Sequence, residues 1–299
     1  MRPAVVEWRM GQTLNLVIAG VAAGCVYALV ALGFVLIYKA TEVVNFAQGE
    51  LMMLGGFAGL ALAAAGWPWP LALAGAALGG ALAGRLVERA ALRPLAGQPH
   101  IPVVMTTLGV GFMLQGGVLM APGWGAETHA LPTPFAGRAV ALAGATVAAD
   151  HLLVIGVTAL LGLALFAFFR FARAGKALAA TAQNPLGARL VGIPLARMHG
   201  LAWALAAGLA AAAGVLLAPI TFVHAHMGLI GLKALPAAVI GGFGSVPGAV
   251  LGGLLLGLVE SFAGFYAPDG VKDVAAHALV LAVLLLRPAG LFGKPPENP

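Results

Sequence analysis

Long stretches of this 299-residue sequence contain no Asp, Glu, Lys or Arg. The first of them covers residues 13–38, and similar stretches recur along the rest of the chain. A helix needs about 20 mainly apolar residues to cross the hydrocarbon core of a bilayer. Charged residues make up 9% of the chain, whereas a soluble domain carries about 25%. Such a chain cannot cover a surface in contact with water, so we expect lipid to surround most of it.

The uncharged stretches predict an all-α, polytopic membrane protein with eight or nine transmembrane helices, some of them short or discontinuous. The first stretch is too long for the core of a signal peptide and is not followed by a small-residue cleavage site, so we interpret it as a retained helix. The segment Gly66-Trp67-Pro68-Trp69-Pro70 predicts an interfacial turn. We expect one transmembrane domain over residues 1–299, with spans at residues 13–38, 51–65, 71–86, 101–121, 151–171, 201–218, 228–242, 247–263 and 274–286.

Basic residues gather in two of the connections between these spans. Residues 85–100 carry three arginines and one glutamate, and residues 170–199 carry five basic residues and no acidic one. The positive-inside rule predicts that both connections are cytoplasmic. Residues 122–150 are then a periplasmic loop, in which we expect short extended pieces. Arg2 and Arg9 favour an N-terminus inside, whereas counting spans back from Arg85 favours one outside, and the sequence leaves this open.

The first candidate site is the polar segment Asn45-Phe46-Ala47-Gln48-Gly49-Glu50, where the second span begins. Asn45 and Gln48 have the spacing of a capping box, and Glu50 in the first turn suits the helix dipole. The segment is equally compatible with a half-helix whose polar N-terminus lines a translocation path. In both interpretations these residues must face protein, water or the interface, because facing lipid would leave polar groups unsatisfied.

The second candidate site is the acid-free connection at residues 172–199. Its helix formers are interrupted by Asn184-Pro185 and stopped by Gly192, which predicts a short surface helix, a turn and a second short helix. Small side chains there leave backbone accessible for a partner protein. The alternative is an ordinary basic loop lying on anionic lipid.

The third candidate site is the segment from Lys233 to Gly248, which two prolines and several glycines interrupt. Non-helical backbone at membrane depth is tolerated only against protein or a water-filled cavity. We therefore place Gly241 and Gly242 on the translocation path, together with Asn45, Gln48 and Glu50. A tight turn between two helices is the alternative.

Missing motifs restrict the function further. The sequence has no phosphate-binding loop, no H-E-x-x-H, no C-x-x-C and no G-x-S-x-G. We expect no enzymatic activity and no cofactor, and we expect no metal site at His224-Ala225-His226, which lacks a third ligand nearby. The net charge of +6 is explained by cytoplasmic loops, so we expect no nucleic-acid partner. Glu260 is interpreted as an interfacial anchor in preference to a path group. Any active transport must take its energy from another chain.

Three segments together resemble the LivH-type permeases, membrane subunits of bacterial ABC importers for branched-chain amino acids. They are residues 33–50, with GFVLIY and VNFAQGE; residues 175–193, with GKAL, AQNP and ARLVGI; and residues 233–249, KALPAAVIGGFGSVPGA. Relatives often carry Arg where this chain has Lys176, which keeps the positive charge. The resemblance implies that the second segment is the loop that couples to the ATPase, and it assigns this role to Gly175, Lys176, Ala180, Asn184, Ala188, Gly192 and Ile193.

The same resemblance implies a multi-pass permease of the bacterial inner membrane that works by ATP-driven alternating access. Its implied partners are a second, LivM-like permease, two cytoplasmic ATPase subunits and a periplasmic substrate-binding protein. Urea, short-chain amides and other amino acids remain alternative cargoes, and the sequence does not decide whether the permease pair is a homodimer or a heterodimer. A secondary transporter, a passive channel and a membrane-embedded enzyme are the competing classes. The missing intramembrane ionisable pairs disfavour the first of these, and the missing catalytic clusters disfavour the last.

Overall fold

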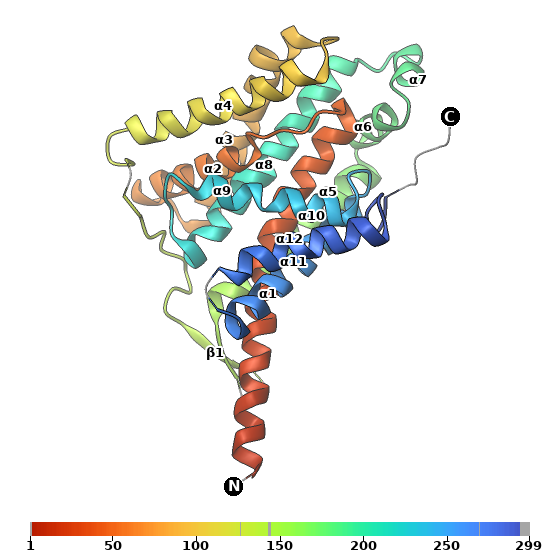
Figure 1. The fold of residues 1–299 in the computed structure, drawn as a ribbon. Helices are drawn as coiled ribbons and strands as arrows, with labels where there is room; N and C mark the ends of the chain where they lie inside the picture. The colour runs from red at the N-terminus through yellow and green to blue at the C-terminus, as the bar shows by residue number, and fades with distance from the viewer. Residues whose placement is uncertain (1, 126, 143–144, 269, 294–299) are drawn as a thin grey trace.

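The computed structural model describes residues 2–125, 127–142, 145–268 and 270–293, with the backbone alone for residues 2–10 and 273. Helices dominate this part of the chain, as the sequence predicts (Figure 1). The helices are α1 (Arg2–Thr41), α2 (Gln48–Ala64), α3 (Trp69–Val87), α4 (His100–Met120), α5 (Ala149–Phe171), α6 (Arg173–Gln183), α7 (Pro185–Leu190), α8 (Leu195–Thr221), α9 (Met227–Leu232), α10 (Ala234–Gly241), α11 (Val246–Tyr266) and α12 (Val271–Leu286).

Six helical segments of the described chain are long and apolar enough to cross a membrane. They are α1 from Gly11, α3 with its extension to Leu95, α4, α5, α8 and α11. Three shorter apolar segments accompany them: α2, α9 with α10, and residues 274–286 of α12. The prediction of an all-α polytopic membrane protein is confirmed. The predicted number of eight or nine spans depends on the three short segments.

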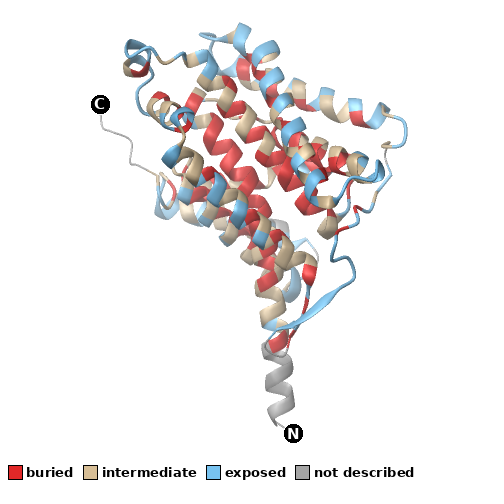
Figure 2. Cartoon of the chain, turned by 180° about the vertical axis from the view of Figure 1, so that it is seen from behind, coloured by how far each residue is buried: buried red, intermediate tan, exposed pale blue. Residues whose placement is uncertain are grey.

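The core of the molecule lies along α1 and α8, where buried residues concentrate, and these residues are red in Figure 2. Small residues let the helices approach closely, as expected where lipid supplies little driving force for helix association. A Cβ at Gly24 of α1 would lie 2.8 Å from Leu254 Cα of α11. A Cβ at Gly55 of α2 would overlap the backbone of Ala211 in α8. Glycine is therefore required at these crossings.

The same close contacts give the relative directions of the helices. Gly20 of α1 lies against Leu258 of α11, and Gly24, farther along α1, lies against Leu254, so these two helices are antiparallel. The α3 helix is likewise antiparallel to α8. The α2 helix runs parallel to α8, because Gly55 meets Ala211 and Gly59 meets Val215.

The connection between α4 and α5 contains an antiparallel hairpin of β1 (Ala139–Leu142) and β2 (Ala145–Ala148), which confirms the predicted extended pieces. Alternate residues of β2 are buried, and Ala145 and Val147 pack on Ile18 of α1. The hairpin therefore covers the part of α1 nearer the N-terminus, at the opposite end of the molecule from α6 and α7 (Figure 1).

Two helical segments are interrupted. The α3 helix continues into one π turn (Glu88–Leu92) and one 3₁₀ turn (Arg93–Leu95), where Pro94 removes a donor. The predicted span at residues 228–242 is discontinuous, as expected: α9 and α10 meet at Lys233, and Pro236 has no N–H for the carbonyl one turn earlier.

Candidate functional site

The polar turn at residues 45–50 is folded into the interior of the helix layer. Asn45 Nδ2 donates to Gln48 Oε1 over 3.0 Å, and Asn45 Oδ1 accepts from the Ala47 N–H over 3.0 Å. Gln48 Nε2 donates to the carbonyl of Ala206 in α8 over 3.0 Å. Both side chains are fully buried, so they hold the chain where it turns from α1 into α2. A contact between these two residues and a cargo stays a prediction.

Gly33 of α1 makes this arrangement possible. A Cβ at this position would overlap Nε2 of Gln48 and would lie 3.1 Å from the Ala206 carbonyl oxygen. Gln48 therefore crosses from α2 to α8 directly over the bare backbone of α1. Asn45 and Gln48 do not form the capping box that their spacing suggested, because no side chain caps the first residues of α2. Their side-chain amides hydrogen bond to each other instead.

Glu50 lies on the more open side of the same turn and differs from its two neighbours. It is partly exposed, and its Oε2 atom is buried without a hydrogen bond from any described residue. Its carboxylate rests on Gly228 of α9, where a Cβ would overlap both oxygens. A Cβ at Gly111 of α4 would lie 3.4 Å from Glu50 Cγ.

The α4 helix contributes polar groups to this place that the sequence interpretation missed. Thr107 Oγ1 accepts from the Phe46 N–H over 3.2 Å, and Gln115 Nε2 donates to the carbonyl of Ala225 over 3.2 Å. With Gly111 between them, these residues recur every four positions and share one helix face. That spacing inside an apolar span was the signal that could have revealed them. We call the set Glu50, Thr107, Gly111, Gln115 and Gly228 the polar seam.

Gly241 and Gly242 lie apart from the polar seam, at the far end of α10 from α9. A Cβ at Gly241 would overlap the backbone of Gly248, so α10 and α11 touch there. Gly242 has a φ of 92°, which ends α10. The carbonyls of residues 240 and 241 accept from the Leu291 N–H over 2.8 Å and the Phe292 N–H over 3.2 Å. Of the five predicted path residues, the structure therefore places Asn45, Gln48 and Glu50 together in the polar turn and the two glycines elsewhere.

The predicted helix, turn and second helix in the basic connection are confirmed as α6 and α7. We call residues 173–193, which contain these two helices, the arm. Its base is held by the ends of three helices: Leu178 packs with Ala40 of α1 and Ala202 of α8, and Gly175 lies against the backbone of Phe168 in α5. Lys176 is exposed and Ala180 half-buried. Beneath α6, a mainly apolar cavity of about 350 Å³ opens between α1, α5 and α11.

The tip of the arm is shaped by four of the predicted coupling residues. Asn184 Oδ1 accepts from the Gly187 N–H over 2.8 Å and so caps α7. Ala188 is buried, and its carbonyl accepts from the Ile193 N–H over 3.0 Å. Gly192, with a φ of 84°, donates to the Arg189 carbonyl over 3.1 Å. These bonds form a Schellman motif, which explains the glycine.

The tip also presents apolar side chains that the sequence interpretation did not single out. Leu186, Leu190 and Val191 are 74%, 89% and 76% exposed. Two leucines four residues apart on a short helix in a basic connection were the available signal. In a membrane protein, exposed apolar side chains inside a span face lipid, but these belong to a polar connection between spans. Such a cluster is typical of a protein–protein contact.

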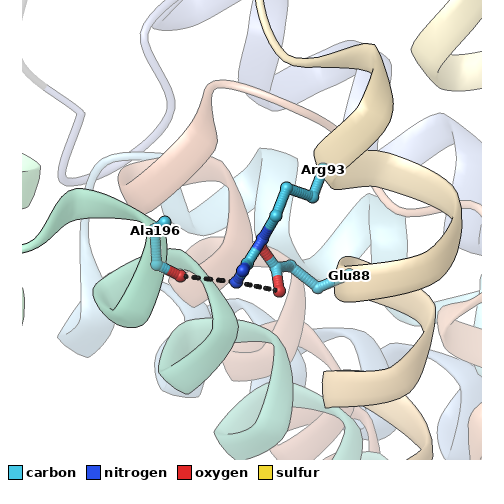
Figure 3. A network of polar contacts seen from close by, with 3 residues as sticks. All are labelled: Glu88, Arg93 and Ala196. Carbon is cyan, nitrogen blue, oxygen red and sulfur yellow. Dashed lines mark hydrogen bonds and ion pairs between the residues drawn. The ribbon is translucent and has the colours of Figure 1, made fainter.

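The interrupted end of α3 carries an ion pair, and the arginine of this pair hydrogen bonds to the start of α8 (Figure 3). Arg93 Nε and Nη2 donate to the two carboxylate oxygens of Glu88 over 3.2 and 3.1 Å, and Nη2 also donates to the Ala196 carbonyl over 3.1 Å. Glu88 is 4% exposed. A cavity of about 410 Å³ adjoins the Glu88–Arg93 ion pair and is lined by residues of α4, α7 and α8, among them Arg189.

Glu260 of α11 is a buried member of a second polar cluster. The Tyr27 hydroxyl donates to Glu260 Oε2 over 2.5 Å, and Lys233 Nζ and Lys272 Nζ lie 3.9 and 4.0 Å from its carboxylate oxygens. At 2% exposure the carboxylate joins α1, α11, α12 and the α9–α10 junction. This position differs from the interfacial anchor that the sequence suggested.

The histidine pair His224 and His226 lies between α8 and α9. Burial lowers the pKa of His224, and the neighbouring His226 lowers this pKa further because two adjacent positive charges repel. Within the described part of the chain no three His, Cys, Asp or Glu side chains are placed to hold a metal ion.

Comparisons with known proteins agree with this architecture. Residues 16–286 match the family model described as "Branched-chain amino acid transport system / permease component". The permease protein LivH of the high-affinity branched-chain amino acid transport system of Escherichia coli K12 is 35% identical, over 92% of this chain and 94% of its own. The corresponding protein BraD of Pseudomonas aeruginosa is 33% identical, over 94% and 96%.

A solved structure gives an independent comparison of the fold. One chain of "PsaBC from Streptococcus pneumoniae in complex with Fab" superposes with a TM-score of 0.50 over 95% of this chain and 97% of its own, at 18% identity. At this identity the likeness concerns the fold alone.

Proposed function

Because the chain belongs to the family of permease components of branched-chain amino acid transport systems, we propose that it is the membrane-spanning subunit of a bacterial ABC importer. In this proposal it forms the translocation path for branched-chain amino acids such as leucine, is located in the inner membrane and catalyses no reaction itself. The observation that carries the proposal is the match over residues 16–286, which contains both the polar turn and the arm.

The direction of the helices supports one orientation in the membrane. The arm is basic and contains no acidic residue, so the positive-inside rule favours the cytoplasm for it. The last turn of α1 packs on the arm through Ala40, and the hairpin packs on Ile18 near the other end of α1. In this orientation α1 starts outside. The short segments α2, α9 with α10, and α12 are then crossings too, so that nine crossings put the C-terminus inside.

The path is proposed to run along the polar seam. Asn45 and Gln48 fix the turn, and Glu50 faces the path between α4 and α9. Gly241 and Gly242 act at the other end of α10, where a change in the angle between α10 and α11 would alter the opening toward the cytoplasm. The glycines allow such a change because two backbones touch there without side chains between them.

The arm is proposed to dock on a cytoplasmic ATPase subunit. Leu186, Leu190 and Val191 supply an apolar contact of the kind that a partner groove covers. Gly175, Lys176, Ala180, Asn184, Ala188, Gly192 and Ile193 shape or flank this contact. The base of the arm joins α1, α5 and α8, so a displacement of the tip would reach the helices that hold the polar turn. ATP-driven alternating access would use this connection.

The complete importer would contain two ATPase subunits, a periplasmic binding protein and a second, LivM-like permease. Co-expression with candidate ATPase and LivM-like permease chains, followed by purification through a tag on this chain, tests the assembly. We expect ATPase chains to co-purify and leucine uptake into proteoliposomes to require ATP. Uptake that survives without ATP and follows an ion gradient would contradict the proposal. Stimulation by urea, with no response to leucine, would replace the cargo and keep the architecture.

A further inference from the structure

Glu50 is an ionisable side chain for which the described part of the protein provides no counter-ion. None of the ion pairs between described residues includes Glu50, and no described group donates a hydrogen bond to its buried Oε2. Glu88 and Glu260, which are buried acidic residues, differ from it in having counter-ions, since each lies within 4.0 Å of a Lys or Arg nitrogen. Glu260 Oε1 also lacks a hydrogen bond from a described group, but it lies 3.9 Å from Lys233 Nζ. Glu50 is thus left available to a group that the described residues do not supply.

The carboxylate lies near the middle of the helix layer. Gln48, two residues before it, bonds to Ala206, which is the twelfth residue of the 27-residue helix α8. At 1.5 Å per residue, this point lies about 17 Å from the start of a helix about 40 Å long. An ionisable side chain at that depth is costly against lipid and marks a path for ions or substrates when it faces water or protein.

Two glycines leave room around the carboxylate on both sides. Any side chain at Gly228 would overlap the Glu50 oxygens, whereas a Cβ at Gly111 would lie in ordinary contact with Glu50 Cγ, at 3.4 Å. Both helices that flank Glu50 therefore present bare backbone to it. The space is adapted to the carboxylate group, which argues against an accidental position on the surface of α2.

The face of α4 that meets Glu50 carries Thr107 and Gln115, and the remainder of that helix is mainly apolar. Thr107, Gly111 and Gln115 lie one turn apart along this face, over about 12 Å. Phe112 and Met113, on the other side, are 71% and 77% exposed, as expected for side chains that face lipid. Glu50 consequently belongs to a polar seam that runs along α4, and the side of α4 away from this seam is apolar.

From these observations we propose that Glu50 binds the ammonium group of a zwitterionic amino-acid cargo during its passage along the polar seam. The inference rests on the proposed function and adds to it the chemical group of the cargo that the permease recognises. An ammonium group supplies three donors and a positive charge, and charge-assisted hydrogen bonds to a carboxylate are stronger than those between neutral groups. Cargo of this kind would provide the missing counter-ion transiently, without leaving a permanent ion pair that closes the path.

The test uses the assembled transporter, with its ATPase and second permease, in two measurements. The first is ATP-dependent leucine uptake in proteoliposomes with saturating binding protein. The second is direct binding to the complex without binding protein, with leucine and with 4-methylpentanoate, which is leucine without its amino group. The variants are Glu50→Gln, Glu50→Asp and, as a matched control, Glu42→Gln, which removes the same charge from an exposed position at the end of α1.

For the wild-type complex we expect leucine to bind at least about tenfold more tightly than 4-methylpentanoate, the size of one charge-assisted hydrogen bond. Glu50→Gln should remove this preference and reduce the maximal uptake rate about tenfold, with the amount of assembled complex unchanged. Glu50→Asp should keep part of the preference for leucine and part of the uptake rate. Glu42→Gln should behave as wild type in both measurements.

Three outcomes would overturn the inference. Equal binding of the two probes by the wild type would show that the ammonium group is not recognised. A preference that survives Glu50→Gln would assign the recognition to another residue. Loss of the second permease from the Glu50→Gln complex would show that Glu50 pairs with a cation of that subunit. Absence of any ATP-dependent leucine uptake by the wild type would instead overturn the proposed function itself.

Discussion

The polar turn at residues 45–50 and the arm at residues 173–193 both consist of short polar sequences between apolar spans, yet they are built in opposite ways. In the turn, Asn45 and Gln48 are fully buried and each hydrogen bonds within the protein. In the arm, the polar groups of Asn184 and Gly192 form local caps, and Leu190 is exposed. The two amides of the turn are satisfied by their own chain, whereas the proposed role of the arm requires a partner.

The difference has a physical origin in the surroundings of each segment. At membrane depth water does not compensate for a missing hydrogen bond, so the fully buried amides of the polar turn must be satisfied internally. Outside the membrane the backbone can be satisfied by local caps, and apolar side chains can stay exposed until they are covered by another surface. Changes in the turn should therefore lower stability, and changes in the arm should lower activity. Four predictions test this contrast, in order of decreasing effect on the free energy of unfolding.

The largest effect is expected where α2 crosses α8, beside the polar turn. Gly55→Ala places a methyl group on the backbone of Ala211, so the two helices must separate, at a cost of about 3 kcal/mol or more. Gly56→Ala is the matched control, because a Cβ there meets only ordinary contacts of 3.4 Å and more. Thermal unfolding in detergent should show a much lower midpoint for the first variant. Equal midpoints would show that the crossing is looser than described.

An intermediate effect is expected inside the turn itself. Gln48→Ala leaves Asn45 Nδ2 without its acceptor and removes the bond to Ala206, which should lower the free energy of unfolding by about 1–3 kcal/mol. Gln183→Ala, at the exposed end of α6, is the control and should change little. Unfolding in a denaturing detergent series measures both, and a neutral Gln48→Ala would contradict the view that this side chain holds the turn.

A smaller effect is expected at the tip of the arm. Gly192 has a φ of 84°, and a Cβ added there would meet no described atom within 4 Å. Gly192→Ala therefore costs only conformational strain, about 1 kcal/mol. Gly192→Asn should cost less, since Asn tolerates this conformation better. Hydrogen exchange of residues 185–193 should rise in the order Gly, Asn, Ala. A similar rise at α2 would mean that the arm is not an independent unit.

The smallest effect on stability should accompany a large effect on uptake. Leu190→Ser removes an apolar side chain that is 89% exposed, so the free energy of unfolding should change by less than about 0.5 kcal/mol. If the ATPase covers this residue, uptake and co-purified ATPase should fall about tenfold, the loss expected at the centre of an interface. Leu163→Ser, at an exposed position of α5 within the span, is the control for loss of an apolar surface residue. Normal uptake by Leu190→Ser would remove this residue from the docking site.

Several features of the fold could be predicted because they are local properties of the chain. The uncharged stretches correspond to the helices, Gly192 ends the segment that contains α7, and Pro236 accompanies the junction between α9 and α10. Asn184 was expected where the arm turns, and its side chain caps α7 there. Helix propensity, capping and the length needed to cross a bilayer depend on residues a few positions apart, so the sequence alone contains this information.

The sequence by itself determined that this chain is helical, membrane-embedded and related to permeases, together with the positions of the polar turn and the arm. Only the tertiary structure decided what those segments touch. Gln48 reaches Ala206 over Gly33, Glu50 is set between Gly111 and Gly228, and Gly241 lies away from both, against Gly248. The reason is physical: a helix presents several faces, and its neighbours come from segments far away in sequence. The spacing within one span therefore cannot reveal which glycine of another span will make room for its side chain.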